Sequence, residues 1–180
     1  MLSRYYSLSQ PVTSDDHSQG PDNAPVTLVE YADYQCPYCG QAHPIVKQIQ
    51  AHFGDSLRFV FRNFPLAQMH VHALKAAEAA EIAREYGKFW AMHDLLYEHQ
   101  DRLDRTSLLG YARQLGIDES EFARKLDADE KADRIKEEFM GGVNSGVNGT
   151  PSFFINGVKY ENSWDYESLK EAIALSSGSR

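Results

Sequence analysis

The 180-residue chain is predicted to be an α/β protein, with a mixed sheet flanked by helices and an all-helical subdomain inserted between its halves. The first half opens with a strand, a helix and a strand, an order that implies two parallel neighbours joined by a helical crossover. The second half closes with a hairpin and a helix, which adds an antiparallel pair. Residues 68–146, between the halves, show no convincing strand spacing and exceed what one crossover needs. The predicted domains are a polar tail (1–22), a two-part sheet domain (23–66 and 129–180) and a helical insertion (67–128).

The elements of the first half follow from hydrophobic spacing. Residues 26–31, VTLVEY, are β-branched and almost all apolar, as expected of a strand covered on both faces. From 37 to 53 the apolar residues recur with helical spacing, and Gly54 is suited to end that helix. Residues 57–63, LRFVFRN, alternate like a strand. Residues 1–22 show no periodicity and are predicted to be a mobile or loosely docked tail, so the fold should begin near residue 24.

The central block and the end of the chain carry clear signals for helix and turn boundaries. Asp118 with Glu121 resembles a capping box that opens a helix. Asn156-Gly157 is suited to the tight turn of a hairpin over 151–160. Helices are expected over 72–87, 88–100, 107–116, from residue 118 onward and over 128–142, with a closing helix over 165–175.

Composition excludes several classes of protein. With 26 acidic and 18 basic side chains the net charge is −8, which argues against a nucleic-acid partner, because phosphates require clustered Lys and Arg. No stretch approaches the roughly 20 apolar residues that span a bilayer, so no membrane insertion is expected. The N-terminal residues contain no apolar segment typical of a signal peptide. The sequence as it stands therefore predicts a cytoplasmic protein, or a periplasmic or otherwise extracytoplasmic one if an export signal was removed.

The chain has only two cysteines, Cys36 and Cys39, and they form a Cys-Pro-Tyr-Cys segment where the first strand gives way to a helix. At a helix start, unpaired N–H groups and the positive end of the dipole favour a thiolate. Cys36 is expected to be exposed and nucleophilic, and Cys39 to be shielded and placed to attack a mixed disulfide on Cys36. Pro37 suits the first helical position. A purely structural disulfide is the weaker interpretation, because closing so short a loop contributes only roughly 2 kcal/mol.

An acid in the first strand and a proline before the hairpin are further candidate site residues. Glu30 interrupts the apolar first strand, and burial there would raise its pKa towards neutrality, where it could exchange protons with Cys39. Alternatively, Glu30 lies at a strand edge and reaches water.

Thr150-Pro151 precedes the hairpin. A proline is tolerable at the first residue of a strand, whereas a cis peptide would place a backbone edge beside Cys36.

The stretches APVTLVEYADYQCPYCG, FRNFPL, KFWAMHDLLY and GVNGTPSFFINGV resemble, in order, the DsbA-like branch of the thioredoxin superfamily. The resemblance covers most of the chain after the tail. It implies a thioredoxin fold interrupted by a helical domain, and the activity of a thiol–disulfide oxidoreductase. It also implies the site residues: a nucleophile (Cys36), a resolving cysteine (Cys39), a proton-handling acid (Glu30), a cis-proline (Pro151) and the residue before it, which lines and tunes the site (Thr150).

Tyr38 departs from the pattern of the strongly oxidising members, which carry His before the second cysteine. A less oxidising couple is therefore expected. No cofactor is expected, and no metal, because Cys36 and Cys39 supply only two of the four ligands of a structural zinc. The expected partners are thiol- or disulfide-containing proteins or small thiols, together with an unidentified redox partner. The protein itself is expected to be a monomer.

Two alternative functions remain open. One is a non-catalytic, chaperone-like binding module with a vestigial redox pair. The other is a disulfide isomerase. The second is disfavoured because residues 1–22 are too short to form the separate dimerisation domain of the classical isomerases.

Overall fold

The computed structural model describes residues 6–178 and divides the chain into two compact units. The first comprises the stretches 1–32, 41–62 and 140–180, apart from the few terminal residues outside the described range. The second comprises 33–40 and 63–139. The domain boundaries expected from the sequence remain predictions.

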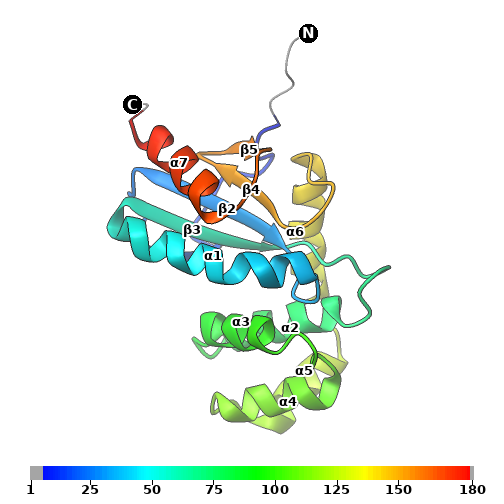
Figure 1. The fold of residues 1–180 in the computed structure, drawn as a ribbon. Helices are drawn as coiled ribbons and strands as arrows, with labels where there is room; N and C mark the ends of the chain where they lie inside the picture. Colours follow the sequence, from blue (N-terminus) through cyan, green and yellow to red (C-terminus); the bar gives the residue numbers. More distant parts are fainter. Residues whose placement is uncertain (1–5, 179–180) are drawn as a thin grey trace. The chain divides into compact units, whose positions relative to one another are not determined.

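The first unit is built on a five-stranded sheet with the strand order β1-β3-β2-β4-β5 (Figure 1). The pairs β1–β3, β2–β4 and β4–β5 are antiparallel. Helix α1 connects β2 to its sheet neighbour β3, which is the crossover that a parallel pair requires. The strands are β1 (His17–Gln19), β2 (Val26–Ala32), β3 (Leu57–Asn63), β4 (Ser152–Ile155) and β5 (Val158–Tyr160).

The strand expected at 26–31 is β2, and it lies between two neighbours in the sheet. Six of its seven residues are buried, as the almost continuous apolar run predicts. The expected hairpin is formed by β4 and β5. Asn156 and Gly157 at its turn have φ of 48° and 83°, and this left-handed geometry is what a two-residue hairpin turn requires.

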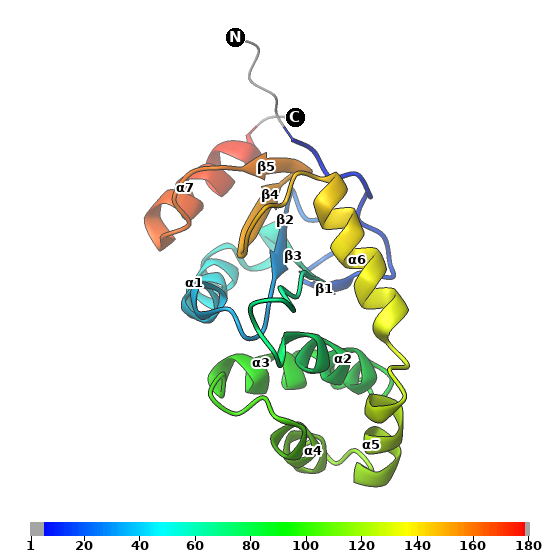
Figure 2. The same ribbon diagram turned by 90° about the vertical axis from the view of Figure 1, so that its right-hand side faces the viewer.

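Two helices lie on the same side of this sheet (Figure 2). Helix α1 (Pro37–Phe53) ends at Gly54, whose φ of 50° is accessible to glycine at little cost. Helix α7 (Tyr166–Ser177) begins at Asp165, whose carboxylate accepts a hydrogen bond from the N–H of Ser168. The buried apolar side chains of the sheet and of these two helices include Leu28, Val29, Ile49, Phe59, Phe61, Phe154, Leu169 and Ile173.

The N-terminal segment differs from the prediction. Strand β1 pairs with β3, and the N–H of Leu8 donates to the carbonyl of Gly157 at 2.9 Å. Arg62 donates to the carboxylate of Asp16 and to the main-chain carbonyls of Gln10 and Pro11. The prediction of a loosely docked tail was therefore wrong for residues 6–22, and its first five residues lie outside the described range. A strand of three residues carries too little periodicity to be recognised without its partner.

The second unit is helical, as expected. Its helices are α2 (Ala73–Arg84), α3 (Phe89–Glu98), α4 (Arg105–Gln114), α5 (Glu119–Asp127) and the first part of α6 (Ala132–Asn144). Asp118 caps α5 by accepting a hydrogen bond from the N–H of Glu121, as the predicted capping box requires. Within this unit α2 packs against α3, α4 and α5. In the part of the chain that the structure describes, no helix combines the length and the apolar character needed to cross a membrane.

Candidate functional site

The two cysteines lie at the junction between β2 and α1, in the part of the junction that belongs to the second unit. Pro37 is the first residue of α1, where its missing N–H costs nothing. Cys36 stands immediately before the helix, and its carbonyl accepts the hydrogen bond from Gly40 N–H that opens the helical pattern. The first turn of α1 contains no acidic residue. The positive end of the helix is therefore not neutralised by the side chains of its own first turn.

Both cysteines are free thiols and both are buried. Cys36 retains 4% of its surface exposed and Cys39 retains 0%. The prediction that Cys36 would be exposed was wrong, although its order relative to Cys39 is as expected. Within the second unit, the side-chain amide of Gln100 donates to the carbonyls of Tyr34 and Cys36 at 2.8 and 2.9 Å. This amide packs so closely over the loop that a Cβ at Gly40 would lie 2.0 Å from its oxygen.

Backbone hydrogen bonds bind both cysteines to Asp33. The carbonyl of Asp33 accepts from the N–H of Cys36 at 3.2 Å. The N–H of Asp33 donates to the Sγ of Cys39 at 3.5 Å. A donor aimed at sulfur is complementary to a thiolate.

Tyr38, between the cysteines, is 60% exposed. It lies on the outer side of the loop, whereas Tyr34 is buried and its hydroxyl lies 2.9 Å from Nδ1 of His93.

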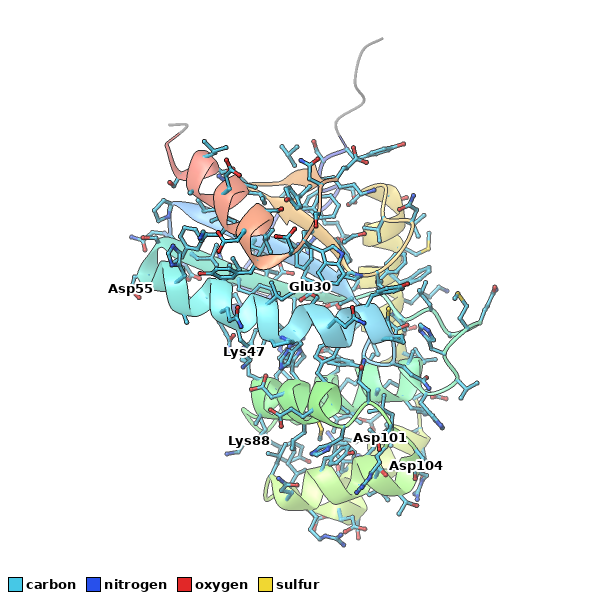
Figure 3. All side chains as sticks on the ribbon, viewed as in Figure 1. Glu30, Lys47, Asp55, Lys88, Asp101 and Asp104 are labelled. Carbon is cyan, nitrogen blue, oxygen red and sulfur yellow. The ribbon has the colours of Figure 1, made fainter. Side chains whose placement is uncertain are left out.

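Glu30 belongs to the first unit and lies on the central strand β2 (Figure 3). Only 3% of its surface is exposed, and its register partner on β4 is Phe153. Desolvation by burial raises the pKa of Glu30 to about 8. The interpretation that Glu30 reaches water at a strand edge is therefore wrong, and the expected burial is confirmed.

The peptide bond between Thr150 and Pro151 is cis, as predicted. It directly precedes β4, whose first residue, Ser152, is the register partner of Tyr31 on β2. Within the first unit, Pro151 therefore lies directly before the strand that pairs with the strand of Glu30. The structure thus brings the predicted residues together in two sets, the cysteines in one unit and Glu30 with Thr150-Pro151 in the other.

Sequence reasoning missed the side chains that hold the cysteine loop. The carboxylate of Asp33 accepts hydrogen bonds from the N–H groups of Gln35 and Leu66 and from His70. Asp33 could have been noticed as an acid between an apolar strand and the first cysteine. Gln100 lies 64 residues beyond Cys36, and no local pattern marks it.

The thioredoxin family model matches residues 12–174, which is most of the chain. The chain belongs to this family. Its structure resembles that of BdbD from Bacillus subtilis in the oxidised state, with a TM-score of 0.85 and 27% identity over 97% of this chain and 98% of that one. It also resembles a thioredoxin-like oxidoreductase from Silicibacter pomeroyi DSS-3, with a TM-score of 0.82 and 28% identity over 93% of this chain and 95% of that one.

Wolbachia pipientis α-DsbA1 shares the fold, with a TM-score of 0.81 and 22% identity over 95% of this chain and 94% of that one. These likenesses, together with the family match, show the thioredoxin fold expected from the sequence.

Curated relatives include proteins named as Na⁺/H⁺ antiporters. The chain is 47% identical over 167 residues to NhaA 1 of Salinispora arenicola, which covers 92% of this chain and 26% of that protein. The match to NhaA 3 of Salinispora tropica is 46% identical, with the same coverage. The chain thus spans about a quarter of the length of these relatives, and the transport named in them belongs to the whole proteins.

Proposed function

We propose that the chain is a thiol–disulfide oxidoreductase that exchanges disulfides with proteins or small thiols through Cys36 and Cys39. In the oxidising direction, a substrate thiolate attacks the Cys36 sulfur of the Cys36–Cys39 disulfide. The Cys36–Cys39 bond breaks and Cys39 leaves as a thiolate that takes up a proton. A second substrate thiolate then attacks the substrate sulfur of the mixed disulfide, and Cys36 leaves. Two electrons pass from the substrate to the cysteine pair, and the reverse sequence reduces a substrate disulfide.

The observation that carries this proposal is the position of the cysteine pair at the start of α1. Cys36 precedes a helix end with no acidic residue in its first turn, and Cys39 lies one turn into the helix with a backbone N–H directed at its sulfur. Of the two cysteines, only Cys36 retains exposed surface. This order supports Cys36 as the residue that an incoming sulfur reaches first.

Glu30 is proposed to supply and accept the proton that Cys39 exchanges in each cycle. A pKa of about 8 lets this carboxyl change its charge near neutral pH, which is what a proton shuttle needs. Its place on the strand that leads into the cysteine loop, six residues before Cys36, supports this role. Thr150 and Pro151 are proposed to hold the backbone of an extended substrate, as the family resemblance implies.

The test is an exchange assay with the Cys36→Ser and Cys39→Ser variants, using insulin reduction and the oxidation of a reduced peptide. Cys36→Ser is expected to lose at least 99% of the activity, since the nucleophile is gone. Cys39→Ser is expected to accumulate a mixed disulfide on Cys36 that mass spectrometry detects. If Cys36→Ser keeps the activity of the wild type, the cysteine pair does not carry that activity and the proposal fails. Partner binding that Cys36→Ser leaves intact, without exchange activity in the wild type, would indicate a binding module.

The direction of electron flow depends on the compartment, for which two alternatives stay open. In the cytoplasm Cys36 would be kept reduced and would reduce its substrates, whereas in an extracytoplasmic compartment the cysteine pair would be oxidised and would form disulfides. Alkylation trapping in cells, combined with fractionation, measures both properties. An oxidised pair in an extracytoplasmic fraction would contradict the cytoplasmic prediction and indicate disulfide formation.

A further inference from the structure

Asp33 is a buried acid that the proposed exchange does not use. Its side chain has 0% exposure, and its carboxylate accepts hydrogen bonds from Gln35 N–H at 2.7 Å, Leu66 N–H at 2.8 Å and His70 Nδ1 at 2.8 Å. Two of these contacts come from main-chain N–H groups, which can only donate, and Nδ1 of His70 completes the set. Together they satisfy polar oxygen atoms that burial alone would make costly.

The same residue contacts both cysteines through its main chain. Its carbonyl accepts from Cys36 N–H, and its N–H donates to the Sγ of Cys39. The contacts of the carboxylate with Gln35, Leu66 and His70 fix the side-chain rotamer of Asp33, and the hydrogen bond to Cys36 N–H fixes its carbonyl. Together they restrain the residue whose N–H group points at the Cys39 sulfur.

The segment that carries His70 depends on these polar contacts. Met69 and Val71 on either side of it are 74% and 79% exposed, so they bury little apolar surface. Leu66 and Met69 line an open apolar pocket of about 580 Å³, so these side chains are not covered on that side. The N–H of His72 also donates to Oε1 of Gln35 at 2.7 Å, and within the segment the N–H groups of Met69 and His70 donate to the carbonyl of Leu66.

We propose that Asp33 and His70 form a positioning pair, in which His70 holds Asp33 so that its N–H group stays on the Cys39 sulfur and stabilises Cys39 as the departing thiolate. This inference rests on the proposed function, because it concerns the step in which the Cys36–Cys39 bond breaks and Cys39 leaves. The N–H also bonds the Cys39 sulfur of the reduced form, and the sulfur of a disulfide is a weaker acceptor, so losing the donor destabilises the reduced form and makes the couple less oxidising. Hydrogen bonds to charged groups contribute enough that removing one corresponds to roughly a tenfold change in the equilibrium constant.

The test compares His70→Asn with His70→Leu. The side-chain nitrogen of Asn stands where Nδ1 of His stands, one bond from Cγ, so Asn retains a donor to Asp33, whereas Leu removes it. The readouts are the equilibrium constant of the cysteine pair in a glutathione buffer and the rate at which a small thiol opens the disulfide. His70→Leu is expected to shift the equilibrium about tenfold towards the oxidised form and to slow the opening by a similar factor, while His70→Asn stays within about twofold of the wild type.

Two further variants separate positioning from general damage to the fold. His70→Gln carries its donor at the position of Nε2, one bond too far, and is expected to behave like His70→Leu. His72→Leu is the matched control, since it changes the neighbouring imidazole but keeps the backbone N–H that Gln35 accepts, and it should leave both readouts unchanged. Denaturant unfolding of each variant, in both redox states, shows whether it is folded.

The inference is overturned if His70→Leu matches the wild type, or if His70→Asn shifts the equilibrium as far as His70→Leu does. Should His70→Leu fail to fold, the contrast between Asn and Gln decides. If the wild-type chain itself shows no exchange, the proposed function fails instead, so the two failures are distinguishable.

Discussion

Glu30 is a carboxylic acid on the central strand of the sheet, and burial gives it two consequences at once. Because water is excluded, the neutral form is favoured and the pKa rises to about 8, from an ordinary value of 4.5. The same shift that suits the side chain to proton exchange near neutral pH makes its ionisation costly to the fold. Ionisation of Glu30 should therefore contribute to the way the stability of the protein depends on the pH.

Glu30→Gln is expected to change how stability depends on pH. In the wild type the neutral acid is favoured in the folded state, so its contribution is full below about pH 4.5 and is lost as the pH rises towards 8. The variant cannot ionise, so its free energy of unfolding should match the wild type at pH 4.5 and exceed it by roughly 2–4 kcal/mol near pH 9. Urea unfolding at several pH values measures this difference.

Glu138 contributes to the pH dependence of stability in both the wild type and Glu30→Gln. Its pKa is raised to about 7, first by burial and then by the charge of Glu81. Both the wild type and Glu30→Gln therefore lose stability between about pH 4.5 and 7 through this residue, and subtracting the two curves isolates Glu30. Parallel curves for the two proteins would show that Glu30 ionises freely in the folded chain.

Tyr38 carries the prediction about the strength of the couple. A histidine at this exposed position would place a cation beside the Cys36 thiolate and stabilise the reduced form. Tyr38→His is therefore expected to raise the reduction potential, by about 30 mV for each unit by which the pKa of Cys36 falls. Equilibration with glutathione measures this shift. A wild-type potential near about −120 mV, typical of the strongest oxidants, would contradict the predicted weaker couple.

At the scale of elements, the N-terminal segment shows how a buried ion pair can order a stretch without regular structure. The side chains of Arg62 and Asp16 are 4% and 10% exposed, and two hydrogen bonds join them at 2.8 and 3.0 Å. Arg62 also donates to the hydroxyl of Tyr31 and to the carbonyl oxygens of Gln10 and Pro11. One side chain on β3 thus connects the N-terminal segment to the sheet.

Asp16→Ala is expected to destabilise the protein by about 3–5 kcal/mol, because it leaves the guanidinium of Arg62 buried without its counter-charge. The segment before β1 should then become sensitive to limited proteolysis. The matched control is Asp127→Ala, which breaks the ion pair with Arg105, whose side chains are 55% and 54% exposed. That change should have little effect on the stability, because water screens an exposed ion pair. Equal losses from the two variants would show that the Asp16 pair does not order the segment.

At the scale of the whole molecule, the redox state of the cysteine pair is linked to the stability of the fold. Whatever stabilises a thiolate at the start of α1 stabilises only the reduced protein, since the disulfide carries no such charge. The difference in stability between the two redox states therefore reports the same interactions as the reduction potential.

The oxidised protein is expected to unfold at a lower urea concentration than the reduced protein. The reduction potential of the cysteine pair can be compared between the folded protein and the unfolded chain. For each 30 mV by which the folded value is higher, the reduced protein should be more stable than the oxidised protein by about 1.4 kcal/mol. Paired unfolding curves of the oxidised and reduced protein measure it. A more stable oxidised protein would show that the helix start does not favour the thiolate.

Much of the fold and part of the site could be predicted from short stretches of sequence. The strand at 26–31 was recognisable because burial on both faces leaves a continuous apolar run. The helix at 37–53 was recognisable because burial of one stripe leaves apolar residues at helical spacing. The capping box at Asp118 and the turn at Asn156-Gly157 were recognisable because each is a contact between residues at most three positions apart. The order of the cysteines relative to the helix followed from the same local reasoning.

The sequence by itself therefore determined the elements, the thioredoxin fold and the two sulfurs at a helix start, because all of these depend on neighbours along the chain or on a widely shared pattern. Only the tertiary structure decided that β1 joins the sheet, that Gln100 covers the loop at Cys36, and that His70 holds Asp33. Each of these depends on groups at least 37 residues apart that meet only after folding, and their contact depends on the path of the chain between them.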